Sequence, residues 1–376
     1  MKHRRKFRPK ALAPILATVF VVLSASGAFV VQSYLRNSEP DRQAEIAATG
    51  NLPQDQLGAP SGAPSASGSV APSPSLSVKP SASVSAKPKP STSKSKSSST
   101  SYVGGGGSCA LPRYPTPACT GVPAGWKPKK TVNGDLTITK SGTVVTDQLV
   151  TGSIIVRASD VTISRSRVYG SIDNFHGNVI YGHTTIKDTE VVNPPGQEYS
   201  KNDQYAFGVA DYTCLRCKVI NRMEGWRVGA SDYKGAGKVV IQDSFAQLAV
   251  PPGMCASDDP HGDGIQAYQG PTVTIRHNTI DQRLDECPTA PIFVPDQGND
   301  GAVVQDNLIA GGGYAIRLTG GDFPAVTGNK VVAGSFGYGP MEVSCGLIDN
   351  FSGNATVKYD WSTGRITSTV KAINEC

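Results

Sequence analysis

The stretch VTIRHNTI at residues 273–280 decides the fold, because the chain repeats its pattern seven times. Each copy alternates apolar and variable residues, places a small, mostly polar residue at its sixth position and ends on an apolar one. The copies start at residues 161, 184, 212, 239, 273, 302 and 324, so successive starts are 22 to 34 residues apart. Repeats of this length are typical of solenoids, in which each unit buries its apolar face against its neighbours.

Within one copy, Val273 and Ile275 point to one side and Thr274 and Arg276 to the other, which is the period of a β-strand. A second short strand is expected in each later coil, at WRV 226, IQA 265, IFV 292, IRL 316 and MEV 341. A sandwich would show hairpin turns and no repeated phrase, and a propeller blade would need a longer, four-stranded repeat. We therefore predict an all-β chain of stacked coils with parallel pairing.

The small residue at the sixth position predicts a tight turn in every coil. Asn tolerates left-handed backbone, and its amide can bond from one coil to the next, so we expect both features in this column. Its members are Ser166, Thr189, Cys217, Ser244, Asn278, Asn307 and Asn329.

Residues 130–345, which hold these repeats, resemble the right-handed parallel β-helix superfamily, the pectate-lyase-like fold. The resemblance implies a single β-helix domain over residues 109–376. It implies no particular activity, because the signatures of pectate lyases and polygalacturonases are not evident in the chain.

The N-terminal part has a different composition. Residues 1–36 combine six basic residues in the first ten with an apolar run from Ala11 to Val31, which predicts a membrane-spanning signal anchor or, alternatively, a cleaved signal peptide. Residues 37–108 become rich in Ser, Pro, Ala and Lys, which predicts a disordered linker. Together they resemble the tether of a secreted, cell-surface protein of actinobacterial type.

The distribution of charge and of cysteines indicates which partners and which compartment the protein has. Residues 1–108 carry thirteen Lys and Arg against four acids, so the net charge of +6 leaves the remaining domain slightly acidic. This argues against a nucleic-acid partner. Membrane contact is expected only through the N-terminal segment, and the protein is expected to be a monomer.

All eight cysteines lie at or beyond Cys109, which suggests disulfides in an oxidising compartment.

Spacing alone does not fix the connectivity of these cysteines. The expected pairs are Cys109–Cys119, Cys214–Cys217, Cys255–Cys287 and Cys345–Cys376. The C-L-R-C phrase at 214 could instead be a redox or zinc motif, but both cysteines fall on structural positions of the repeat, and no second pair is close by.

The longest interval between copies contains CASDDPHGDGIQAY at 255–268, between Cys255 and Cys287. Long insertions in a solenoid often form its binding face. Gly262 and Gly264 are expected to free the backbone so that His261 and Asp263 point outward. The HGDGIQ phrase resembles one found in secreted β-helix and carbohydrate-active proteins.

Strand alternation predicts a row of outward side chains, one per coil, beside this loop. Such a row suits sugars, because arginine can bind a uronate carboxylate and an aromatic ring can stack on a sugar ring. We expect Glu224 at the same level of its coil as Asp263. The members of the row are Arg227, Gln266, Phe293, Arg317 and Glu342.

Two chemistries fit these residues. Glycoside hydrolysis needs a protonated acid and a second carboxylate, which Asp263 and Glu224, or Asp258 or Asp259, could supply. A polysaccharide lyase would use His261 as base and Arg227 or Arg317 to neutralise a uronate. The family resemblance adds Ca²⁺ as a candidate cofactor, held by Asp258, Asp259 and Asp263.

The alternative is a non-catalytic β-helix that binds glycan or belongs to the cell wall. On that hypothesis, Asp258, Asp259 and Pro260 form only a turn, and Glu224 and Arg227 pair with one another.

Overall fold

The computed structural model describes residues 109–200, 205–229, 237–257 and 262–376. The predicted anchor at 1–36, the linker at 37–108, and Asp258, Asp259 and His261 lie outside the described residues. Over the described part, no helix is long and apolar enough to cross a membrane.

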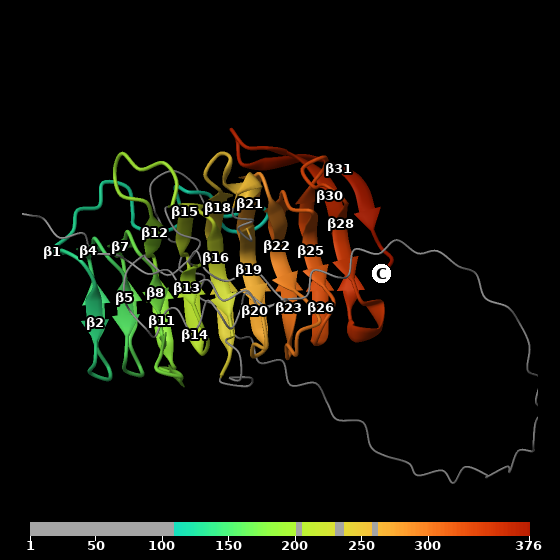
Figure 1. Cartoon of the computed structure of the whole chain (residues 1–376). Coiled ribbons are helices and arrows are strands. Elements are labelled where there is room, and N and C mark those ends of the chain that lie inside the picture. The colour runs from blue at the N-terminus through green and yellow to red at the C-terminus, as the bar shows by residue number, and fades with distance from the viewer. Residues whose placement is uncertain (1–108, 201–204, 230–236, 258–261) are drawn as a thin grey trace, which may run out of the picture.

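The chain forms an all-β solenoid whose coils stack along one axis, and each complete coil contributes one strand to each of three parallel sheets (Figure 1). Sheet A contains β1 Lys130–Val132, β4 Gln148–Val150, β7 Arg167–Val168, β12 Glu190–Val192, β15 Lys218–Arg222, β18 Phe245–Ala249, β21 Thr279–Leu284, β24 Leu308–Ala310, β27 Lys330–Val332, β30 Asn354–Asp360 and β31 Arg365–Ile373. Sheet B contains β2 Leu136–Ile138, β5 Ile154–Val156, β8 Ile172–Asp173, β13 Tyr205–Gly208, β16 Glu224–Val228, β19 Gly262–Ala267, β22 Pro288–Val294, β25 Tyr314–Leu318 and β28 Gly339–Val343. Sheet C contains β3 Val144–Thr146, β6 Thr162–Ser164, β11 Thr184–Lys187, β14 Tyr212–Leu215, β17 Val239–Gln242, β20 Val273–Arg276, β23 Gly301–Gln305, β26 Asp322–Thr327 and β29 Phe351–Ser352.

Small elements decorate this frame. The hairpin of β9 Phe175–His176 and β10 Val179–Ile180 interrupts one coil, and the short 3-10 helices η1 Met254–Ala256 and η2 Cys345–Leu347 lie in loops. The described residues include no α-helix.

The apolar positions of the repeat fill the interior, as predicted. The phrase forms the sheet C strand and continues into sheet A, and its inward Val and Ile side chains join one continuous core. The second-strand column also points inward, because Trp226, Ile265, Ile292 and Ile316 are at most 1% exposed and Met341 packs against the core. Stacking coils removes these faces from water, which is the main force holding a solenoid together.

The sixth position forms a buried ladder, as predicted. Each Asn amide nitrogen donates to the Oδ1 of the next, at 3.1 Å from Asn278 to Asn307, 2.9 Å from Asn307 to Asn329 and 3.0 Å from Asn329 to Asn354. Each amide also donates to a backbone carbonyl of the preceding coil, such as that of Ile275. The ladder satisfies polar groups that would otherwise be buried without partners.

The expectation of left-handed backbone at the sixth position is wrong by one residue. The positive φ belongs to the fifth position, where φ lies between 42° and 55° in the coils without glycine. The turn is made at the fifth residue. The sixth residue directly precedes the sheet A strand, and its side chain points inward to the ladder.

The fifth-position residues form a second ladder, which we call the charged column. Acidic and basic residues alternate along it, and consecutive members pair at 2.8 Å (Arg165 to Asp147), 2.6 Å (Arg216 to Asp188) and 2.6 Å (His277 to Asp243). Its members are Asp147, Arg165, Asp188, Arg216, Asp243, His277 and Asp306. These pairs offset the strain of left-handed backbone at non-glycine residues, which costs on the order of 1–3 kcal/mol each.

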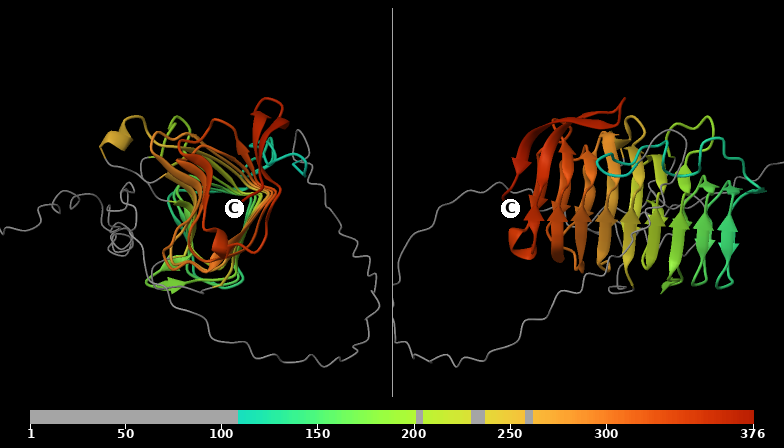
Figure 2. Two further views of the ribbon diagram at one scale, coloured as in Figure 1. Left: turned by 90° about the vertical axis from the view of Figure 1, so that its right-hand side faces the viewer. Right: turned by 180° about the vertical axis from the view of Figure 1, so that it is seen from behind.

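The two ends of the described chain cover the outer face of sheet A (Figure 2). Residues 109–126, which we call the N-terminal strap, run across it, and the antiparallel hairpin β30–β31 lies on the same side. Tyr114 of the strap packs with Leu308, Val332 and Val357, and Tyr359 and Trp361 of the hairpin border the same cluster.

All four predicted disulfides form: Cys109–Cys119, Cys214–Cys217, Cys255–Cys287 and Cys345–Cys376. The described residues contain no free cysteine, and the C-L-R-C phrase therefore forms a disulfide rather than a metal site.

Candidate functional site

The predicted outward row is present on sheet B in the expected register. Arg227 pairs with Gln266 across β16 and β19, Gln266 with Phe293, Phe293 with Arg317, and Arg317 with Glu342 on β28. The row is less accessible than alternation suggested, because Gln266 is 3% and Phe293 is 6% exposed. Strand alternation gives the side of the sheet that a residue occupies, but not what covers that side.

Asp263 lies at the start of β19 and is 1% exposed, so the expectation that it points into solvent is wrong. Its Oδ2 accepts a hydrogen bond from Gln266 Nε2 at 2.7 Å, and its Oδ1 accepts one from the Ala290 amide at 3.2 Å. Burial, together with the charge of Glu224, raises the pKa of Asp263 well above its usual value. Both influences favour the protonated form of this carboxyl group.

Glu224 is buried at the start of β16 and forms an ion pair with Arg227, whose Nη2 lies 2.9 Å from Oε2. Burial alone would lower the pKa of Arg227, but the Glu224 carboxylate outweighs it and raises that pKa. The structure therefore places a carboxyl group with a raised pKa near a carboxylate that is ion-paired. Two neighbouring acids in environments that differ in this way are a feature of acid–base sites.

Aromatic rings and orphaned polar atoms surround this pair. The Arg227 guanidinium lies 5.5 Å from the Tyr205 ring centre and 6.0 Å from that of Tyr268. Among the described residues, Arg227 Nε and Gln266 Oε1 are buried and have no hydrogen-bond partner. Such atoms are rare in folded proteins and are often found where a ligand or water completes the site.

At the β25–β28 end of the outward row, the side chains contact one another. Arg317 forms an ion pair with Glu342, and its guanidinium lies 5.4 Å from the Phe293 ring centre. Tyr268 meets the Phe293 ring edge-on at 5.8 Å. Phe293, at 6% exposure, therefore offers no open face for a ligand, whereas the Arg317 side chain is 39% exposed but already paired.

Sequence reasoning missed Asp285, which lies next to the predicted site. Burial raises the pKa of this carboxyl group, against the opposing hydrogen bonds from Gln282 and the Cys287 amide. A Cβ atom on Gly262 would collide with its carboxylate. Gly262 is therefore glycine because it leaves room for Asp285, and Gly264 because the Pro291 carbonyl approaches it, rather than for backbone freedom.

Asp285 also lines an open cavity of about 430 Å³ between the ends of the sheet A strands and the starts of the sheet B strands. Phe336 and Tyr338 form an aromatic wall, and Tyr338 is 81% exposed. Arg283 also borders the cavity, where it pairs with Asp281 at 2.8 Å and stacks on Trp361 at 4.0 Å. The sequence signal that could have revealed Asp285 is its place two residues before Cys287, inside the disulfide-closed segment.

The described residues offer no acidic cluster for Ca²⁺. Asp263 already accepts hydrogen bonds at both oxygens, and Asp258 and Asp259 lie outside the described residues. Within the described ranges, the one group with metal-ligand spacing is Cys255, Asp285 and Cys287, and both of its cysteines are held in a disulfide.

Comparison of the chain with protein-family models, with curated proteins and with solved structures found no match. The coils, sheets and disulfides thus define the class of protein as an all-β solenoid with stacked parallel strands.

Proposed function

We propose that the protein is an extracellular, surface-anchored, polysaccharide-active enzyme on a right-handed parallel β-helix of the pectate-lyase-like type, and that it is a glycoside hydrolase. The observation that carries this proposal is Asp285, a carboxyl group with a raised pKa that lines an open cavity beside the exposed Tyr338 and the half-buried Phe336. The four disulfides agree with an oxidising compartment.

Glycoside hydrolysis needs a carboxylic acid that keeps its proton until the leaving oxygen departs, and a raised pKa provides this. Asp285 would donate that proton, because it is the acid that borders the cavity. The second carboxyl group of the pair would come from Asp263, which follows Gly262 on β19, or from Glu224 on the neighbouring strand β16. Tyr338 and Phe336 would stack on the apolar faces of sugar rings.

The pairing of the arginines favours hydrolysis of a neutral glycan over lyase chemistry on a uronate. A lyase needs a cation to stabilise the developing enolate. Arg227, Arg317 and Arg283 are each already paired with a carboxylate. A uronate would have to displace one of these partners.

The test is cleavage by the purified full chain of a panel of neutral and acidic polysaccharides, with and without Ca²⁺. We expect new reducing ends without the ultraviolet absorbance of unsaturated ends, and a loss of at least 100-fold in Asp285→Asn, on the scale of general acid catalysis. Asp349→Asn, which changes an exposed acid in the last coil, is the matched control and should cleave normally.

Undiminished cleavage by Asp285→Asn would remove that residue from the mechanism. Unsaturated ends would favour the lyase instead. Binding across the panel without cleavage would favour the non-catalytic glycan-binding alternative.

A further inference from the structure

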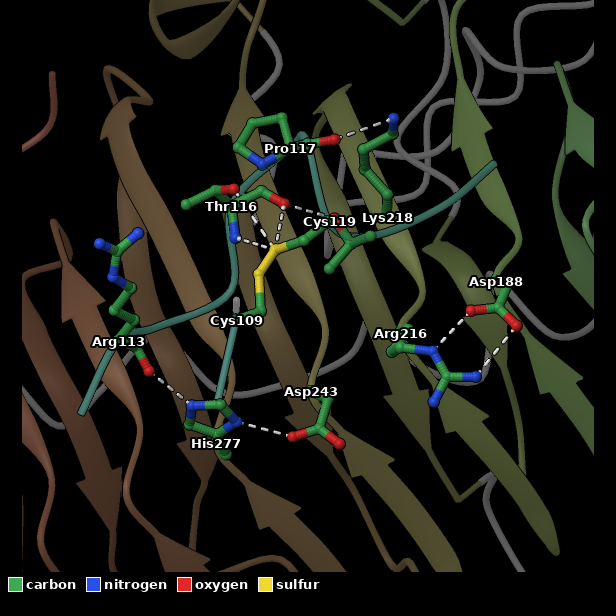
Figure 3. The surroundings of a disulfide bond; sticks show 11 residues. Cys109, Arg113, Thr116, Pro117, Cys119, Asp188, Arg216, Lys218, Asp243 and His277 are labelled. Carbon is green, nitrogen blue, oxygen red and sulfur yellow. Dashed lines mark hydrogen bonds and ion pairs between the residues drawn. A yellow bond between two sulfur atoms is a disulfide. The ribbon is translucent and has the colours of Figure 1, made fainter. Parts of the chain in front are cut away.

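His277 is the histidine of the charged column, and it lies beneath the N-terminal strap at 6% exposure (Figure 3). Its Nδ1 lies 2.6 Å from Asp243 Oδ1 in the preceding coil. Its Nε2 lies 2.8 Å from the backbone carbonyl oxygen of Arg113, a residue 164 positions away in the strap. The imidazole thus bridges the solenoid and the strap.

Both partners of the ring can only accept hydrogen bonds at neutral pH. A neutral imidazole carries one N–H, so it can satisfy only one of the two contacts and would turn a lone pair towards the other oxygen. The imidazolium carries two N–H groups and satisfies both. The geometry therefore requires the charged form of His277.

The alternation of acids and bases along the charged column also supports a charged His277. Arginines occupy the basic positions of the earlier coils, Arg165 and Arg216, and each pairs with the acid one coil before it. His277 takes the next basic position and replaces a permanent charge with a titratable one.

The other groups facing the ring agree with a cation. Asp306 acts on it from the following coil, and the Tyr114 ring lies against it at 5.8 Å between centres. Arg113 offers its carbonyl, and its guanidinium points away from the ring in Figure 3.

We propose that His277 is a pH-operated clasp, which holds the N-terminal strap on sheet A when the imidazole is charged and releases it when the imidazole loses its proton. The released part would be residues 109–116. Beyond it, Lys218 donates to the Pro117 carbonyl at 3.4 Å, Gly121 to the Arg216 carbonyl at 2.8 Å and Val122 to Glu190 at 3.3 Å, and none of these bonds depends on His277.

The direction of the pH response follows from linkage. Burial lowers the pKa of His277, but the bonds to Asp243 and Arg113 and the charge of Asp306 outweigh it, so the net pKa is raised. A raised pKa in the closed state means that the clasp is fully closed below the ordinary imidazole value of about 6.5 and opens as the pH rises through the higher value. The strap continues directly into residue 108, so the clasp controls how firmly the solenoid is held at its junction with the N-terminal part.

The test is hydrogen exchange of the full, oxidised chain at pH 5.5 and 8.5, with rates corrected for the intrinsic effect of pH. We expect protection of residues 110–116 to fall by roughly tenfold at the higher pH, the effect of losing one net hydrogen bond. Residues 121–126 serve as the internal control and should change little.

Two variants separate the clasp from a general effect of pH. His277→Arg restores the permanent charge of the earlier coils, so its strap should stay protected at both pH values. His277→Gln has no titratable ring, so the protection of its strap should not depend on pH. Equal protection of the wild-type strap at both pH values would overturn the proposal, and so would a variant that keeps the wild-type pH response.

Discussion

At the residue scale, two neighbouring positions of each turn have different roles. The fifth residue takes left-handed backbone and joins the charged column, and the sixth turns inward to the Asn ladder. The pattern of the sequence predicted the ladder because Asn recurs there. It misplaced the left-handed residue, because Arg165 and Arg216 are not residues that favour positive φ, and the structure shows each of them in an ion pair at that position.

Asn307→Ala tests the ladder. It removes an amide that bonds to Ile275, Asn278 and Asn329, and leaves their buried groups unsatisfied. We expect a loss of about 2–4 kcal/mol in the free energy of unfolding, measured by denaturant titration. The exposed Asn133→Ala is the control and should change stability by less than about 0.5 kcal/mol. A loss for Asn307→Ala no larger than the control's would show that the ladder contributes little.

Asp285 predicts the pH dependence of cleavage. Its protonated form is the active one, and burial raises its pKa. We expect kcat to fall as the pH rises through a value above that of an ordinary Asp, about 3.9. A pH–rate profile with no such descending limb would contradict the assignment of Asp285 as the acid.

At the element scale, the register of β16, β19 and β22 determines which groups meet. The pairing of Trp226 with Ile265 and of Ile265 with Ile292 follows from the repeat and was predictable. The shift in register at Gly262 and Asp263 was not, because the repeat does not encode it, and it lies where the Asp285 carboxylate fills the space beside Gly262.

Gly262→Ala tests this contact. The added methyl group would push the Asp285 carboxylate from its bonds to Gln282 and the Cys287 amide. We expect a loss of about 1–3 kcal/mol in stability together with impaired cleavage. Gly346→Ala is the control, because a Cβ atom there meets nothing within 4 Å. A Gly262→Ala protein that behaves like this control would show that the close packing is not needed.

At the scale of the whole molecule, charge pairs run along the length of the solenoid. The hydrogen bonds of Arg165 and Lys129 lower the pKa of Asp147. Burial would raise the pKa of Asp243, but the hydrogen bonds from His277 and Gln242 outweigh it and lower that pKa. These carboxylates therefore stabilise the fold only while they are ionised.

Acid titration tests the charged column as a unit. A carboxylate with a lowered folded-state pKa contributes stability that is complete above its unfolded value of about 3.9 and is lost as the pH falls below it. We expect the unfolding free energy to fall between about pH 4 and pH 2. Asp147→Asn should show a shallower fall, and an unchanged slope would mean that the column does not govern acid stability.

The sequence by itself determined the coil, the side of each strand that a side chain occupies, and the Asn ladder. These follow from local alternation and from a phrase that recurs in seven coils. The cysteines predicted disulfides, but their connectivity was decided by the tertiary structure. Only the tertiary structure decided that Gln266 and Phe293 in the outward row are covered, that Asp285 lies against Gly262, and that Arg113 contacts His277. The physical reason is that alternation assigns a residue to one side of a strand, whereas its exposure, pKa and partners depend on segments that the repeat does not encode.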